Sequence, residues 1–171
     1  MAINQEPAGS IEALHAYWQE LAQGSTPERA QLDPAAIKQL LPYLYIVEYE
    51  FDPFRVRYIL TGTEVDVWNG FNLTGRYVDE FLAVDTSGAN RILLDCYTEA
   101  QASGRPVFGS YNWPMRAGYP LLVRFGLYPL KVKGIVKQCM AIEDYSNFPA
   151  EAVMDAVVFE DPAKATTPEP E

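Results

Sequence analysis

The stretch 54–76 constrains the possible folds most, because it places a strand, a sharp stop and a helix in direct succession. Every second residue along 56–60 is apolar, which is the period of a β-strand with one buried face. Gly62 ends this strand, and Thr63 follows as a candidate N-cap. Gly70 then ends the helix after about two turns, as a C′ glycine does. The sequence therefore predicts a strand that leads directly into a very short helix.

The remaining elements follow in the order of two strands, several helices and three strands. The predicted elements are a helix from Ser10 to about Ala22, a helix from Asp33 to Leu41, strands at 43–50 and 55–60, short helices at 63–69 and 77–81, a long helix at 87–103, and strands at 107–113, 121–128 and 135–143. This order predicts an α+β domain with an antiparallel sheet and helices collected on one face. The pattern leaves open whether 151–158 forms a helical turn or a strand.

Three segments of the chain, in this order, carry a family resemblance: LDPAAIKQLLPYLYIVEY, RYILTGT and NLTGRYVDEF. Together they resemble the single-domain bacterial PAS family, formerly a domain of unknown function, over 32–145. One departure is Ile59, where that family often carries an arginine. The resemblance implies a PAS fold, with five antiparallel strands, used for sensing or protein contacts, and it implies no particular ligand. We expect an N-terminal helix and linker at 1–31, the PAS domain at 32–148 and an extension at 149–171.

The formal net charge of −10 argues against nucleic acid as a partner, because phosphate binding requires a local excess of Lys and Arg. Part of the negative charge lies at 160–171, which we interpret as a disordered, solubilising tail. The chain has two cysteines, no apolar run long enough to span a bilayer and no signal peptide. These features predict a location in the cytoplasm without membrane contact.

Aromatic side chains between the inner sheet face and the short helices are the candidates for a ligand site. The predicted ligand-binding residues are Tyr58, Trp68, Tyr77, Tyr97 and Trp113, with Phe81 as a further lining residue. Short helices punctuated by glycine can leave a pocket for an apolar or aromatic ligand. Large aromatics also simply fill cores, and we favour that interpretation because native interiors seldom contain sizeable voids.

The known cofactors of PAS domains can be tested on individual residues. Haem-binding members usually ligate iron through a histidine near the long helix, and His15, the only histidine here, lies on the N-terminal helix instead. Photoactive flavin members carry a cysteine between Asn and Arg ahead of that helix, where this chain reads Ala89-Asn90-Arg91. Haem and photoactive flavin are therefore disfavoured. One histidine and two distant cysteines also do not make a zinc site.

Alternation along the strands at 55–60, 121–128 and 135–143 predicts the outer face of the sheet. We expect Arg55, Arg57 and Arg124 to point outward, and in 135–143 we expect Val136, Met140 and Ile142 inside, with Lys137, Cys139 and Ala141 outside. This basic patch on an acidic protein requires a partner. That partner is the N-terminal helix, through Glu12 or Glu20, or a second protein, and the two interpretations are compatible because a helix can bridge two sheets in a symmetric dimer. The predicted interface residues are Leu14, Trp18, Leu21, Arg55, Arg57 and Arg124, and a homodimer is expected.

Three functions are consistent with these features. The favoured one is a free-standing sensory or adaptor module that acts by non-covalent protein contact, with a small ligand in the core modulating it. The alternative is a structural interaction protein with a filled core. The third is a small isomerase that uses Asp66 or Asp95 with Tyr97. We expect no enzyme, because the sequence has no Walker loop and no dinucleotide fingerprint, and its single histidine lies far from both cysteines.

Overall fold

The computed structural model describes residues 9–113, 115–116, 118, 120–149 and 151–152. Five antiparallel strands form one sheet in the order β2-β1-β5-β4-β3. The strands are β1 (Leu44–Glu50), β2 (Arg55–Thr61), β3 (Val107–Trp113), β4 (Leu121–Val132) and β5 (Ile135–Asp144). The helices are α1 (Ser10–Ala22), α2 (Thr63–Asn69) and α3 (Ala89–Ser103), with 3-10 turns η1 (Arg29–Gln31), η2 (Pro34–Ile37), η3 (Leu41–Tyr43) and η4 (Val78–Phe81). The α+β fold predicted from the sequence is confirmed.

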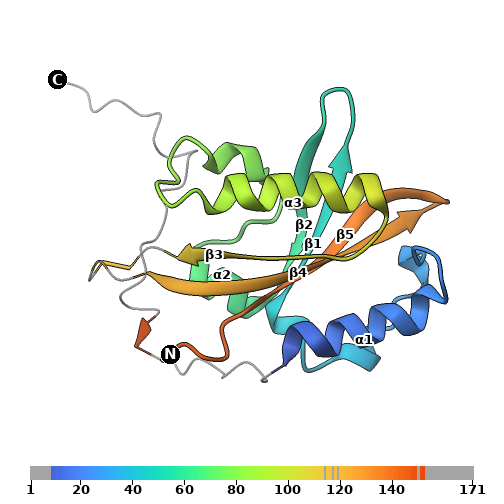
Figure 1. Ribbon diagram of the computed structural model, residues 1–171, viewed down its shortest axis with the longest axis horizontal. Helices are drawn as coiled ribbons and strands as arrows, with labels where there is room; N and C mark the ends of the chain where they lie inside the picture. The colour runs from blue at the N-terminus through green and yellow to red at the C-terminus, as the bar shows by residue number, and fades with distance from the viewer. Residues whose placement is uncertain (1–8, 114, 117, 119, 150, 153–171) are drawn as a thin grey trace.

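Helices cover both faces of the sheet, as Figure 1 shows with α3 on one side and α1 on the other. We call the side packed against α2, η4 and α3 the inner face and the side packed against α1 the outer face. The inner face holds the larger apolar cluster, whose members run in sequence from Tyr45 to Ala152. A smaller cluster joins α1 and η2 to Tyr128, Leu130 and Met140. Each face therefore has its own core.

Helix α1 forms over the range that the apolar spacing predicts. Ile11, Leu14 and Trp18 are buried on the outer face. Two hydrogen bonds fix the helix: the Trp18 indole Nε1 donates to the Pro129 carbonyl at 2.9 Å, and the Tyr128 hydroxyl donates to the Ile11 carbonyl at 2.7 Å. Gly9, not Ser10, stands at the N-cap position. The predicted helix therefore covers the domain's own sheet.

A β-bulge in the pairing of β1 with β2 exchanges the inner and outer faces at the end of β2. Ile46 pairs with Leu60 while Val47 pairs with Tyr58, so Ile59 is an extra residue in β2. Val56 and Tyr58 lie inside as predicted, but Leu60 lies on the outer face and is 45% exposed. The expectation that Leu60 faces inward is wrong, because one inserted residue exchanges the two faces.

A second bulge, in the pairing of β4 with β5, exchanges the inner and outer faces along most of β5. Leu130 pairs with Gln138 while Lys131 pairs with Val136, so Lys137 is the extra residue. Val136 packs against the inner cluster as predicted, but from there to the end of the strand the faces exchange. Cys139 and Ala141 belong to the inner cluster, and Met140 and Ile142 to the outer one. The predicted faces of these four residues are wrong for the same reason.

Smaller differences concern the helices. Asp33 caps the next turn by accepting from the Ala35 amide at 2.9 Å, but the helix expected over 33–41 is two short 3-10 turns. Helix α2 begins after Gly62, where a Cβ would lie 2.1 Å from the Pro42 carbonyl oxygen, so only glycine fits. Ile92 of α3 is 39% exposed. Most of the undecided stretch 151–158 lies outside the described residues. Within them, no helix has the length and apolar character needed to cross a membrane.

Candidate ligand-binding site

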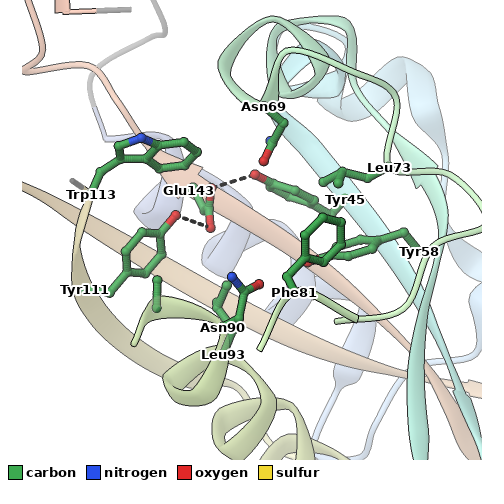
Figure 2. A pocket seen from close by; sticks show the side chains of 11 residues that line it. Tyr45, Tyr58, Asn69, Leu73, Phe81, Asn90, Leu93, Tyr111, Trp113 and Glu143 are labelled. Atoms are coloured by element: carbon green, nitrogen blue, oxygen red, sulfur yellow. Dashed lines mark hydrogen bonds between the residues drawn. The ribbon is translucent and has the colours of Figure 1, made fainter. Parts of the chain in front are cut away.

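The inner face contains a small cavity of about 30 Å³ with a carboxylate in its wall. Glu143, near the end of β5, is only 5% exposed. Figure 2 shows its side chain between the rings of Tyr45 and Tyr111. The lining consists of side chains from β1, β2, α2, η4, α3, β3 and β5, with one from the 70–74 loop: Tyr45, Tyr58, Asn69, Leu73, Phe81, Ala89, Asn90, Leu93, Tyr111, Trp113 and Glu143.

Three tyrosine hydroxyls donate hydrogen bonds to Glu143. The Tyr111 hydroxyl donates to Oε1 at 2.8 Å. The Tyr45 hydroxyl donates to Oε2 at 2.5 Å, and the Tyr145 hydroxyl donates to the same oxygen. These donors come from β1, β3 and the residue after β5, so Glu143 ties together segments that are far apart in the sequence.

Burial dominates the electrostatics of this group. It raises the pKa of the Glu143 carboxyl above the usual 4.5, although the hydrogen bonds from Tyr145, Tyr45 and Tyr111 act in the opposite direction. Burial likewise raises the pKa of Tyr45 and of Tyr111, and the neighbouring Glu143 charge adds to both shifts. The tyrosines therefore stay protonated donors, and burial favours the neutral form of the Glu143 carboxyl.

The residues predicted for ligand binding separate into three groups. Tyr58 and Trp113, together with Phe81, line the cavity. Trp68 lies behind it, stacked on Tyr145 with ring centroids 4.7 Å apart. The third group, Tyr97 and Tyr77, lies away from the cavity.

Tyr97 and Tyr77 do not contribute to the lining. Tyr97 is buried deeper in the inner core, edge-on to Tyr49. Tyr77 lies beyond the β2 edge, where its hydroxyl donates to the Glu50 carboxylate at 3.1 Å. The Arg55 guanidinium stacks on the Tyr77 ring at 3.6 Å from the centroid. Tyr77 was expected in the cavity, but pairing of the 75–77 backbone with β2 turns it toward these charged groups.

Sequence reasoning missed the central residue of this site and all three of its donors, including Tyr145. Glu143 was not singled out, because the reversed faces of β5 were not foreseen. Tyr45 and Tyr111 were not singled out either. One signal was present: Glu143 lies between the apolar run 139–142 and Tyr145, where an acidic side chain is costly unless it is hydrogen-bonded.

The next residue of β5, Asp144, faces the opposite side. Its carboxylate accepts from Arg124 Nη2 at 3.0 Å and from the Ser146 hydroxyl at 2.6 Å. Arg124 Nη2 also lies 3.5 Å from Glu12 Oε1 of α1. This contact confirms the interpretation in which the N-terminal helix supplies an acidic partner for the outer face.

The other predicted interface residues are also engaged within the chain. Leu14 and Trp18 are buried against the sheet, and Leu21 is half-buried. Arg55 binds Asp79 through two bonds of 2.8 Å. Arg57 contacts Glu48 at 3.0 Å and Glu50 at 2.9 Å. Their role toward a second chain stays a prediction.

The residues present do not fit a large cofactor. A cavity of about 30 Å³ has room for about one water molecule, whereas pockets for drug-sized ligands measure about 300–1,000 Å³. His15 lies on the outer face, with its ring centroid 5.2 Å from that of Phe108. Cys96 is half-buried on α3 and is not part of the lining. Among the described residues, no group of three His, Cys, Asp or Glu side chains is placed to hold a metal.

A family model described as a PAS domain matches residues 7–134. The matched range includes α1 and ends just before β5. No curated protein matches the chain.

Solved structures show more distant likeness. The PAS domain of a protein from Colwellia psychrerythraea is 10% identical, with a TM-score of 0.45, 64% of this chain and 93% of that chain covered. The light-oxygen-voltage protein of Rhodobacter sphaeroides is 11% identical, with a TM-score of 0.46 and coverage of 85% and 72%. A light-oxygen-voltage domain described with a flavin analogue is 14% identical, with a TM-score of 0.47 and coverage of 77% and 87%. These likenesses show no cofactor for this chain, and the expectation against haem and photoactive flavin stays a prediction.

Proposed function

The chain belongs to the PAS domain family, and on that premise we propose that it is a sensory module that detects a small ligand at Glu143 and transmits its state to α1. PAS domains are in general sensory, non-enzymatic modules. The proposal adds Glu143 as the site at which the ligand binds and α1 as the element that responds.

One observation carries the proposal: two consecutive residues of β5 serve the two faces of the sheet. Glu143 points into the cavity and is held by tyrosine hydroxyls from three segments. Asp144 points outward and holds Arg124, which reaches Glu12 of α1. A change in the hydrogen bonds of Glu143 therefore shifts the strand end to which the α1 contact is attached.

The mechanism is a population shift. A ligand that binds one arrangement of the tyrosines and Glu143 better than another favours that arrangement by its difference in affinity. The outer carboxylate moves with the strand, and the Arg124 contact to Glu12 strengthens or weakens. The output is then a change in how firmly α1 covers the outer face, which a protein partner can detect.

The test is hydrogen–deuterium exchange of the α1 peptide. Tyr111→Phe removes one donor to Glu143 and keeps the ring, so we expect faster exchange in α1 as well as in β5. Tyr97→Phe is the matched control, because Tyr97 is equally buried but, unlike Tyr111, is not one of the hydrogen-bond donors to Glu143. The combination of Tyr111→Phe with Arg124→Gln should add no further change in α1. Unchanged α1 exchange in Tyr111→Phe would refute the coupling.

The small cavity favours a second candidate, a structural adaptor with a filled core. Native mass spectrometry of the freshly purified protein separates the two, because a mass excess that disappears on denaturation requires a retained ligand. The isomerase alternative has less support. Asp66 accepts from Thr61 and Asn72, Asp95 is exposed, and Tyr97 is buried elsewhere.

A homodimer remains part of the proposal. Leu14 and Trp18 already pack within one chain, so a second copy would meet exposed apolar residues of the outer face, where Leu41 and Leu60 border an open groove. Light scattering after size exclusion tests this: a dimer that Leu60→Lys dissociates supports it, and a monomeric wild type refutes it. A cytoplasmic location also stays a prediction.

A further inference from the structure

We propose that the cavity at Glu143 binds a small cation that carries N–H groups: ammonium, or the ammonium group of a primary amine. The inference rests on the proposed function and deepens it by naming the class of ligand. Its support comes from charge balance, acceptor count, wall chemistry and size.

The described lining of the cavity supplies no cation to balance the Glu143 carboxylate. Glu143 is surrounded by neutral donors, and none of the described lining residues is Lys, Arg or His. An ionised carboxylate buried without a cation is costly, even when it is hydrogen-bonded. A cationic occupant offsets that cost directly, whereas a neutral one does not. The cavity therefore favours a positively charged ligand.

The Glu143 carboxylate has an acceptor position that the tyrosines do not use. A carboxylate offers about two positions on each oxygen. Oε2 of Glu143 accepts from Tyr45 and Tyr145, whereas Oε1 accepts from Tyr111 alone. One position on Oε1 thus remains for a donor from the ligand.

Two amides of the lining add acceptors. Asn69 donates through Nδ2 to the Val65 carbonyl at 2.9 Å, and Asn90 donates through Nδ2 to Asp85 at 3.0 Å. Their carboxamide oxygens accept no hydrogen bond from the described part of the chain, and Figure 2 shows that of Asn69 turned toward the Tyr45 hydroxyl. An ammonium group has several donors and no acceptor, which complements such a lining.

The aromatic lining and the small volume of the cavity also suit a small cation. Five aromatic rings line the cavity, from Tyr45, Tyr58, Phe81, Tyr111 and Trp113, and ring faces attract cations. The volume of about 30 Å³ accepts a group of about the size of a water molecule. Ammonium fits this space, and a longer amine requires movement of the lining. One bound water fits as well, which is the alternative that the experiment must separate.

The test is an NMR titration of ¹⁵N-labelled wild-type protein at constant ionic strength and neutral pH. The probes are ammonium chloride and methylammonium chloride, against sodium chloride, potassium chloride and the neutral isostere methanol. We expect saturable shifts of the Trp113 indole and of β5 amides with the two N–H cations, and at least tenfold weaker binding of the other three probes.

Variants assign the effect to the carboxylate. Glu143→Gln keeps the shape and removes the charge, so binding should weaken at least tenfold. Glu64→Gln is the matched control, because Glu64 is a buried carboxyl of α2 outside the cavity. If Glu143→Gln does not fold, Tyr111→Phe serves instead. It keeps the carboxylate and opens a second position on Oε1, so ammonium should bind at least as tightly as in wild type, and a loss of binding would overturn the inference.

The outcomes distinguish this inference from the proposed function. Equal binding of methanol and methylammonium would overturn the cation assignment while leaving a ligand site at Glu143. Equal shifts with sodium or potassium would overturn it as a general salt effect. No saturable shift with any probe would also overturn it, and the coupling of Glu143 to α1 would still be judged separately by exchange in Tyr111→Phe, which needs no ligand.

Discussion

Glu143 and Asp144 are neighbours on one strand and occupy opposite electrostatic environments. Burial raises the pKa of Glu143, and the three tyrosine donors do not outweigh it. Burial also acts on Asp144, but hydrogen bonds from Ser146 and Arg124 outweigh it and lower the pKa of that carboxyl. The inner face thus favours the neutral form of its carboxyl, while the outer face favours the charged form of the neighbouring one. Four predictions test this contrast.

The largest effect is expected on the outer face at Trp18. Trp18→Ala removes a buried indole and its bond to Pro129, so we expect the free energy of unfolding to fall by about 3–5 kcal/mol. Chemical denaturation measures the change. Gln19→Ala, at the adjacent exposed position, is the control and should change little. A loss below about 1 kcal/mol for Trp18→Ala would contradict the packing of α1 on the sheet.

The next effect tests whether the tyrosines act as one unit around Glu143. Tyr45→Phe and Tyr111→Phe each remove a donor to a buried carboxyl and should each lower the free energy of unfolding by about 1–3 kcal/mol. Because both donate to one group, their effects should not add in the double variant. Thermal denaturation of the four proteins gives the coupling, and strict additivity would argue against a shared network.

The pH dependence separates the two carboxyls. The pKa of Glu143 is raised on folding, so its contribution to stability is complete below the usual 4.5 and is lost as pH rises through the folded pKa. Asp144 has a lowered pKa, so its contribution is present above 3.8 and is lost as pH falls through the folded pKa. In Glu143→Gln the free energy of unfolding, measured across pH, should therefore lose its decline with rising pH above the usual 4.5, and in Asp144→Asn its decline with falling pH below 3.8. Parallel curves would refute the contrast.

The smallest effect is expected at the exposed end of the outer contact. Glu12→Gln removes the charge facing Arg124, whose side chain is 52% exposed, so stability should change by less than about 1 kcal/mol. The difference should vanish in high salt. Exchange in α1 should nevertheless become faster, because this contact joins the helix to β5. A large, salt-independent loss of stability would mean that Glu12 has a structural role beyond this ion pair.

Much of the element order could be predicted because the signals for it are local. The range of α1 follows from its apolar spacing, and Gly70 and Gly104 end their helices in left-handed conformations as expected. β3 has the predicted bounds. The candidate site was predicted only in part. Tyr58, Phe81 and Trp113 line the cavity as predicted. Tyr77 instead lies at the sheet edge, where it contacts Glu50 and Arg55.

The sequence by itself thus determined which segments become helices and strands, since spacing and glycine stops act within a few residues. Only the tertiary structure decided which face the ends of β2 and β5 present. One extra residue, Ile59 in β2 and Lys137 in β5, exchanges the two faces, and each bulge exists only through pairing with a distant strand. That pairing is what turns Glu143 inward to three tyrosines and Asp144 outward to Arg124.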